Sequence, residues 1–247
     1  MNVLITRSEE QAKEFANQLH SLHHKTFFFP TIEIIELNDW KEVDIAIQQI
    51  DNYSNIIFTS TNGVKFFFER FQNFFPLEKL SKKTFHAVGN KTQEAISKFN
   101  IPVSNLPDKF DSKELVKKIL GESNNDTNHF LFPHGNMTDK TIENAFREKN
   151  ISLDSICVYQ TIKPKIDSTL KKEIELQFSN NDIDVITFFS PSSVKNFIEE
   201  YPTMNNTSVA IAVIGNTTKT ACEKIGFNAN QIQFIENLFP QSVISHL

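Results

Sequence analysis

One strand–turn–helix pattern occurs twice in this chain, and it constrains the fold more than any other feature. The copies cover residues 56–64 and 185–194, and each is an apolar run of buried-strand length, then small hydroxyl residues, then a helical pattern. Each copy is followed by a similar glycine-containing turn, at residues 88–92 after the first and 214–218 after the second.

The offset between the copies is nearly constant. Ser60 and Ser190 are 130 positions apart, and Gly89 and Gly215 are 126 positions apart. An offset maintained over so long a stretch indicates an internal duplication. In a chain of 247 residues, it predicts two domains of about 120 residues each.

Strands and helices are expected to alternate along the whole chain. The expected strands cover residues 3–5, 25–29, 56–58, 84–88, 101–106, 130–133, 152–159, 185–189, 209–214 and 231–235. Helical patterns lie between them: one is capped by Asp111, one covers 138–149, one begins at Pro191 and one ends at Gly226. A last helix is expected over 240–247. This alternation predicts an α/β protein with two doubly wound, parallel-sheet domains of the flavodoxin-like kind.

Composition excludes several classes of protein. The net charge of −5 is not that of a nucleic-acid binder, and no apolar run approaches the roughly 18 residues of a membrane span. Cys157 and Cys222 lie far apart, which suits two buried thiols in a reducing compartment. Because the N-terminus starts directly on a strand without an export signal, we expect a cytoplasmic protein, and we expect a monomer.

The hydroxyl-rich turns are the first candidate for a binding site. In a parallel sheet they follow the carboxyl ends of strands, where ligands bind, and each begins a helix with unpaired amides and a partial positive charge. The side chains that add donors there are Ser60, Thr61, Thr92, Ser190, Ser192, Thr217 and Thr218. Such a site suits carboxylates or phosphates. The alternative for any single residue is an ordinary helix cap.

Other candidate sites have weaker support. The sequence contains no phosphate-binding loop and no dinucleotide fingerprint. His20 and His24 lie one helical turn apart, but with no third ligand they indicate an exposed helix surface, and we expect no metal. Tyr159 ends an apolar strand, where either packing or a role in a site is open.

The turns, taken in order, resemble the uroporphyrinogen-III synthase family. The segments that carry the resemblance are 30–33, 58–60, 88–92, 131–136, 155–161, 186–192 and 214–218. They cover essentially the whole chain, and their order and spacing are more specific than any one of them.

The resemblance implies two lobes joined by two linker strands. Residues 1–34 and 166–247 would form one lobe, and residues 37–158 the other. The linker strands would be 32–36 and 159–163. Each lobe would then combine the strand–helix–strand start of one repeat with the remainder of the other.

The resemblance also implies a reaction that needs no cofactor or metal. Members of the family convert hydroxymethylbilane into uroporphyrinogen III: the terminal hydroxyl leaves as water, the last pyrrole ring attacks through a spiro intermediate, and the ring closes inverted. Free substrate closes without inversion, so the enzyme must hold the chain in the productive conformation, in a cleft between the lobes.

Family positions map onto specific residues of this chain. Tyr159 matches the tyrosine that would assist departure of the hydroxyl, as an acid or through water. The expected substrate-binding residues are Ser60, Thr61, Gly89, Thr92, Gly135, Asn136, Ser190, Ser192, Gly215, Thr217 and Thr218.

Two positions depart from the family pattern. Many bacterial members have Arg-Pro where this chain has Arg7 and Ser8, and they tend to have arginine where it has His134. Whether Arg7 and His134 contact substrate is therefore open.

Two other functions are compatible with parts of the pattern. One is a non-catalytic, two-lobed binder or sensor of an acidic small molecule. The other is a pair of phosphoacceptor receiver-like domains, which would need an acidic cluster after the first strand; residues 6–8 lack it.

Overall fold

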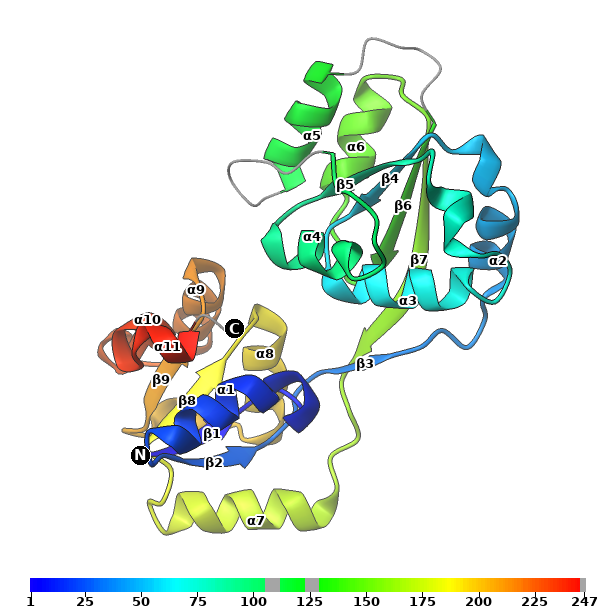
Figure 1. Ribbon diagram of the computed structural model, residues 1–247. Helices are drawn as coiled ribbons and strands as arrows, with labels where there is room; N and C mark the ends of the chain where they lie inside the picture. Colours follow the sequence, from blue (N-terminus) through cyan, green and yellow to red (C-terminus); the bar gives the residue numbers. More distant parts are fainter. Residues whose placement is uncertain (105–111, 123–128, 245–247) are drawn as a thin grey trace. The chain divides into compact units, whose positions relative to one another are not determined.

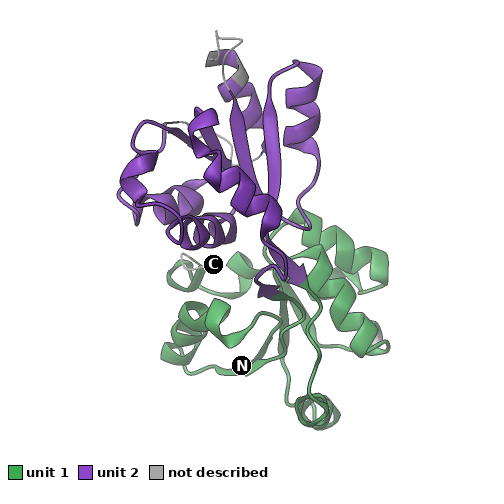
Figure 2. Cartoon of the chain, turned by 90° about the vertical axis from the view of Figure 1, so that its right-hand side faces the viewer, with its two compact units in different colours: residues 1–33, 162–247 green, residues 34–161 purple. Residues whose placement is uncertain are grey.

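A computed structural model describes residues 1–104, 112–122 and 129–244, and the chain divides into two compact units (Figures 1 and 2). Unit 1 comprises Met1–Glu33 and Ile162–Leu247, and unit 2 comprises Ile34–Thr161. The chain passes between the units twice. The strands at these crossings, β3 (Glu33–Ile35) and β7 (Leu153–Ile162), are neighbours in the sheet of unit 2.

Unit 1 is built on a five-stranded parallel sheet in the order β10-β9-β8-β1-β2. Its strands are β1 (Asn2–Ile5), β2 (Lys25–Phe28), β8 (Val185–Phe188), β9 (Ala210–Val213) and β10 (Ile232–Phe234). Its helices are α1 (Glu9–Ser21), α7 (Ser168–Ser179), α8 (Pro191–Glu200), α9 (Asn216–Ile225), α10 (Ile235–Leu238) and α11 (Gln241–Ile244). The strand order is that of flavodoxin-like proteins.

Both faces of this sheet are covered by helices, because successive side chains of a strand point to opposite faces. Val3 and Ile5 pack with residues of α1, α10 and α11. Leu4, between them, packs with residues of α7, α8 and α9 on the other face. The unit is therefore doubly wound.

Unit 2 has a five-stranded sheet in the order β3-β7-β6-β4-β5, in which β7, β6, β4 and β5 are parallel. Its other strands are β4 (Asn55–Phe58), β5 (Thr84–Ala87) and β6 (Phe130–Gly135). Its helices are α2 (Lys41–Gln48), α3 (Thr61–Phe71), α4 (Asn90–Ser97), α5 (Ser112–Glu122) and α6 (Thr141–Glu148). Ile56 and Phe58 face α2, α3 and α4, whereas Ile57 faces α5 and α6.

The two sheets display the duplication directly. The run β7-β6-β4-β5 of unit 2 corresponds to β2-β1-β8-β9 of unit 1. In unit 1, β1, α1 and β2 come from the first repeat, and β8 and β9 come from the second. In unit 2, β6, α6 and β7 come from the second repeat, and β4 and β5 come from the first. The predicted fold class, two doubly wound parallel sheets, is confirmed.

Some predicted elements are wrong. Residues 101–104 form no strand, because Pro102 cannot donate to a ladder; Ser104 donates one bond to the Phe85 carbonyl, at 2.8 Å. The helix expected from Thr138 begins at Thr141, because Asp139 accepts a hydrogen bond from the Thr141 amide. His24 lies beyond the end of α1, so it does not share a helix face with His20.

Other expectations concern residues that the structure does not describe or describes differently. Residues 105–106, Asp111, 123–128 and 245–247 lie outside the described part of the chain. The expected last helix is present as the short α11, and α10 before it was not expected. In the described residues, no helix has both the length and the apolar character that crossing a membrane requires.

Candidate active site

Each sheet has one point where the strand order reverses, and ligands of such folds bind beyond the carboxyl ends of the strands there. In unit 2 this point lies between β4 and β6, and in unit 1 between β8 and β1. The turn after β4 begins at Ser60, and β6 ends at Gly135. In unit 1 the corresponding positions are Ser190 and the residues after Ile5.

Tyr159 brings its phenol to the reversal point of unit 2. Its hydroxyl lies 3.2 Å from Oγ of Ser60, the residue that caps α3. Ser60 Oγ also accepts a hydrogen bond from the Gly63 amide at 3.0 Å. The Tyr159 ring stacks on Phe66 of α3, with ring centres 5.7 Å apart. The phenol is thus held both at its hydroxyl and along its ring.

Gly135 leaves the space that the Tyr159 ring occupies. A Cβ added at position 135 would lie 2.4 Å from Cζ of Tyr159 and 2.7 Å from its hydroxyl oxygen. The pairing of β6 with β7 shifts at this place, since His134 is opposite Cys157 but Gly135 is opposite Tyr159. This β-bulge sets the tyrosine directly across from the glycine.

The Tyr159 phenol is protonated at neutral pH, as tyrosines ordinarily are, and burial makes its ionisation still less favourable. The side chain is 8% exposed. Burial raises the pKa of Tyr159 above its usual range, and the hydrogen bond with Ser60 offsets this only in part. A phenol in this state is a hydrogen-bond donor and a proton source, not a base.

The four predicted helix starts differ in how they are capped. Ser60 Oγ and Ser190 Oγ each accept a hydrogen bond from a first-turn amide of α3 and α8. The N-caps of α4 and α9 are Gly89 and Gly215, which offer no side-chain acceptor. The first-turn amides of α4 and α9 therefore receive no side-chain cap, and such amides are suited to an anionic ligand.

The predicted hydroxyl residues fall into two groups. Thr61 and Thr217 are exposed in the first turns of α3 and α9. Thr92 and Thr218 are buried in the equivalent turns of α4 and α9, with 5% and 1% of their surfaces exposed. Oγ atoms of Ser190 and Ser192 lie 2.9 Å apart. These roles in substrate binding remain predictions.

Asn136 extends the pairing of β6 with β7 beyond the bulge. Its backbone amide donates to the Tyr159 carbonyl, and its side chain exchanges hydrogen bonds with the backbone of Thr161 at 2.8 and 3.2 Å. The side-chain amide is therefore engaged in holding β7, and the residue as a whole is exposed at the end of β6.

Arg7, left open by the sequence, follows β1 at the reversal point of unit 1. Its guanidinium lies 4.1 Å from the centre of the Phe189 ring. Burial lowers the pKa of Arg7 to about 10. Among the residues that the structure describes, no carboxylate lies within ion-pair distance of it. A partly buried cation without an acidic neighbour can accept the carboxylate of a ligand.

Several residues of the site were not found from the sequence. Neither Phe66 nor Gly63 was singled out, although a glycine inside a helical pattern signals close backbone approach. A Cβ at Gly63 would lie 3.2 Å from both the Pro133 carbonyl and Ser60 Oγ. Met137 and Ile214, exposed by 62% and 43%, flank Asn136 and Gly215.

No metal centre is visible in the described residues, which contain no group of three or more His, Cys, Asp or Glu side chains arranged to hold an ion. His20 contacts Thr26 Oγ through Nε2, and His24 contacts the N-terminal amine through Nδ1. Cys157 is half-buried and Cys222 is buried, and both are unpaired thiols.

Comparison with known proteins assigns the family. The family model described as uroporphyrinogen-III synthase HemD matches residues 13–233. A uroporphyrinogen-III synthase from Chlorobaculum parvum is 31% identical over 93% of this chain and 92% of its own length. A putative uroporphyrinogen-III synthase from Methanocaldococcus jannaschii is 28% identical, covering 92% and 90% of the two chains.

Solved structures agree in fold. Uroporphyrinogen-III synthase from Helicobacter pylori has a TM-score of 0.64 and 15% identity, with 99% of this chain and 96% of that chain covered. A mutant of the Thermus thermophilus enzyme gives 0.63 and 15%, with the same coverage. The family match, which spans nearly the whole chain, confirms the resemblance found in the sequence. This chain belongs to the uroporphyrinogen-III synthase family of porphyrin biosynthesis.

Proposed function

We propose that this protein closes hydroxymethylbilane into uroporphyrinogen III, with inversion of the last pyrrole ring. The C–O bond to the terminal hydroxyl breaks, and its methylene carbon bonds to the substituted α-carbon of the last pyrrole ring, which gives the spiro intermediate. That α-carbon then releases the neighbouring bridge carbon, which bonds to the free α-carbon of the same ring as the proton there leaves. With the hydroxide lost at the start, the net product besides the macrocycle is one water. No oxidant or reductant is consumed. Family membership supports this reaction over a non-catalytic binder of acidic molecules.

The observation that carries the proposal is the placement of Tyr159. Its protonated phenol lies at the reversal point of the unit 2 sheet, where substrates of such folds bind. The terminal hydroxyl of the substrate is a poor leaving group until it gains a proton. Tyr159 donates a hydrogen bond or proton to it, directly or through water, and Ser60 can in turn donate to the phenol oxygen.

The strand ends of each unit carry donors that suit carboxylates such as those of the substrate. In unit 2 these are the amides at the start of α4, and in unit 1 the amides at the start of α9 together with Arg7. Thr61 and Thr217 add exposed hydroxyls in first helical turns. The proposed substrate-binding set is that expected from the sequence, with Arg7 added.

The substrate also has an apolar framework of pyrrole rings. We assign contacts with this framework to Met137 and Ile214, because large apolar side chains exposed beside Asn136 and Gly215 would otherwise face water. Ile214 directly precedes the uncapped start of α9, a position that suits a ligand that is apolar in its skeleton and charged at its periphery.

We also propose a lobe organisation, a cellular location and an oligomeric state for this protein. The proposed lobes are residues 1–34 with 166–247 and residues 37–158. The compact units of the structure have slightly different bounds, Met1–Glu33 with Ile162–Leu247 and Ile34–Thr161, and β7 continues through Tyr159 to Ile162. A cytoplasmic location is supported by the two unpaired thiols. The enzyme is proposed to act as a monomer, which size-exclusion chromatography with light scattering would test.

The function is tested by feeding the purified protein hydroxymethylbilane and separating the oxidised products by chromatography. We expect substrate consumption in proportion to protein concentration, with the type III isomer as product. A protein that binds the type III product in calorimetry but leaves substrate consumption at the no-protein rate would instead be a binder.

A further inference from the structure

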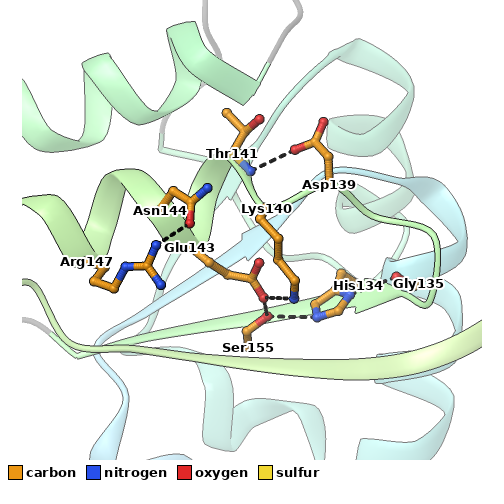
Figure 3. A network of polar contacts seen from close by, with 9 residues as sticks. All are labelled: His134, Gly135, Asp139, Lys140, Thr141, Glu143, Asn144, Arg147 and Ser155. Atoms are coloured by element: carbon orange, nitrogen blue, oxygen red, sulfur yellow. Dashed lines mark hydrogen bonds and ion pairs between the residues drawn. The ribbon is translucent and has the colours of Figure 1, made fainter.

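A chain of hydrogen bonds joins β6, β7 and α6 directly beside Gly135 (Figure 3). His134 contacts the Gly135 carbonyl through Nδ1 and Ser155 Oγ through Nε2, both at 2.8 Å. Ser155 Oγ donates to Oε1 of Glu143 at 2.6 Å, and Lys140 Nζ donates to the same oxygen at 2.8 Å. Nothing in the assignment of the family explains this network.

Counting hydrogens fixes the protonation of His134. The Gly135 carbonyl is only an acceptor, so Nδ1 must carry a hydrogen. Ser155 has one hydroxyl hydrogen, and a Glu143 carboxylate can only accept it. The Ser155 oxygen then faces Nε2 with a lone pair, so Nε2 must carry a hydrogen as well. The network is fully bonded only when His134 is an imidazolium.

The count depends on Glu143 being ionised. Burial raises the pKa of Glu143, but the hydrogen bonds from Lys140 and Ser155, with the charges of Lys140 and His134, outweigh it, so the net pKa lies below its ordinary value. Glu143 is therefore a carboxylate at neutral pH. Its second oxygen, Oε2, is buried and has no partner among the described residues.

The surroundings of His134 contain few other titratable groups. Glu143 approaches from α6 and Lys140 from the residue just before it. Cys157 is the register partner of His134 on β7, and the Phe132 ring lies 5.0 Å away on β6. Burial raises the pKa of Cys157, so this thiol stays neutral where an imidazole titrates.

The network holds the point at which the strand register shifts. The β-bulge lies between His134 and Gly135, and it is this bulge that sets Tyr159 opposite Gly135. His134 fixes the Gly135 carbonyl, while Ser155 ties β7 to α6 four residues before Tyr159. Without the bulge, the residue opposite Gly135 would be Val158 in place of Tyr159.

We propose that His134, as an imidazolium bonded through Ser155 to Glu143, is a positioning residue that holds the β6–β7 bulge and so aims the Tyr159 hydroxyl at the substrate. The claim about catalysis rests on the proposed function, but the protonation state and the bulge do not. His134 thus acts through Tyr159 and need not touch the substrate.

The protonation state is tested on the wild-type protein by nitrogen NMR. With ¹⁵N-labelled histidine, and His134→Gln to assign the signal, both ring nitrogens of His134 should carry hydrogen at about pH 7. A single neutral tautomer at that pH would overturn the proposal whether or not the protein is an active synthase.

The positioning role is tested by Ser155→Ala, which removes the connecting hydroxyl and leaves His134 and Glu143 in place. We expect kcat for type III formation to fall roughly 10-fold, with KM changed less than about twofold. Ser152→Ala, an exposed serine of the same segment, is the matched control and should leave both constants unchanged. Equal kcat in Ser155→Ala and wild type would overturn the role.

The pH profile separates positioning from simple stabilisation. Because the network requires an imidazolium at about pH 7, wild-type kcat should be lower at about pH 9 than at about pH 7. In His134→Gln the amide donates to Ser155 at every pH, so this decrease should disappear. A decrease that persists unchanged in His134→Gln would contradict the proposal. A wild type without type III activity would refute the proposed function and leave the NMR result standing.

Discussion

At the residue scale, the site of unit 2 depends on one side chain and the space made for it. Tyr159 lies over Gly135, stacks on Phe66 and reaches Ser60, so its hydroxyl has little freedom. A positioned donor is more effective than a mobile one, because the conformational entropy of its side chain is already lost when the protein folds. The identity of residue 135 and the hydroxyl of residue 159 are therefore the two features to change.

Removing the hydroxyl should slow catalysis without weakening binding. In Tyr159→Phe we expect kcat to fall about 100-fold, with KM changed less than about twofold, because proton donation is lost while the ring still packs on Phe66. Steady-state kinetics measures this. Tyr201→Phe is the control, since the Tyr201 hydroxyl makes only a 3.3 Å contact with the Lys171 carbonyl. Wild-type kcat in Tyr159→Phe would remove the assigned role.

Filling the space under the ring should destabilise unit 2 and displace the phenol. In Gly135→Ala, the added Cβ would need the position of the Tyr159 ring, and we expect the free energy of unfolding to fall by about 1–3 kcal/mol. Chemical denaturation followed by Trp40 fluorescence measures this, because Trp40 is the only tryptophan and lies in unit 2.

The control for that substitution is Gly121→Ala. A Cβ at Gly121 meets nothing within 4 Å, and the residue lies in α5, so alanine there should stabilise by roughly 0.5–1 kcal/mol. Equal stabilities of the two variants would show that the ring does not occupy the space at position 135.

At the element scale, the helix starts after β4, β5, β8 and β9 all lie at the carboxyl edges of their sheets. α3 and α8 are capped by serines, while α4 and α9 begin at glycines without side-chain caps. A cap serves the helix, whereas an uncapped start leaves amides for a ligand. A negative charge added at an uncapped helix start should therefore stabilise the helix but weaken the binding of an anionic substrate.

Asn90→Asp and Asn216→Asp place a carboxylate at the first residue of α4 and α9. The helix dipole favours this charge, so unfolding free energies should rise by about 0.3–1 kcal/mol. The same charge opposes the carboxylates of the substrate, so KM should rise roughly threefold to tenfold. Asn17→Asp, exposed in the middle of α1, should leave KM unchanged. Unchanged KM in both of the first two variants would mean that these helix starts do not bind substrate.

Most elements could be predicted from local sequence, because their signals are local. Gly226 ends α9 at a φ of 102°, and Pro191 begins α8, as expected. The strand expected at 101–106 is absent at residues 101–104, where Pro102 lacks the amide hydrogen that a strand pairing needs, although its two neighbours are apolar. The contact of Tyr159 with Gly135 was beyond sequence reasoning, since a bulge changes which residues of two distant strands face each other.

At the scale of the whole molecule, the chain builds two similar sheets from exchanged halves of a duplication. Strand pairs from sequence-distant segments, such as β1 with β8 and β4 with β6, form the centre of each sheet. The repeat offset and the alternating pattern were sufficient to predict this class of fold. Which polar side chains become buried in the fold, however, can be seen only in the structure.

His86 is one such group, and it should make the stability of unit 2 depend on pH. Burial lowers the pKa of His86 from 6.5 to about 4, and Nε2 contacts Asn55 Oδ1 at 2.9 Å. Between these values the unfolded chain binds the proton more readily than the folded one. The contribution of His86 to the free energy of unfolding is therefore fully present above pH 6.5. It is lost as pH falls toward 4, and the free energy of unfolding decreases by about 3 kcal/mol in total.

Denaturation monitored by Trp40 fluorescence from pH 7 to pH 4 measures the effect. His86→Gln should be less stable than wild type at pH 7 and should lose less stability on acidification. If wild type and His86→Gln lost the same free energy over that range, the buried imidazole would not be the cause.

The proposed catalysis depends on a polycarboxylate being held at the strand ends while ring closure proceeds with inversion. Its most direct test is the isomer ratio as a function of protein concentration, because free hydroxymethylbilane closes spontaneously to the type I isomer in competition with the enzyme. We predict that the type III fraction rises with protein concentration and approaches all of the product at saturation. Type I product at every concentration, with the ratio of the no-protein control, would contradict it.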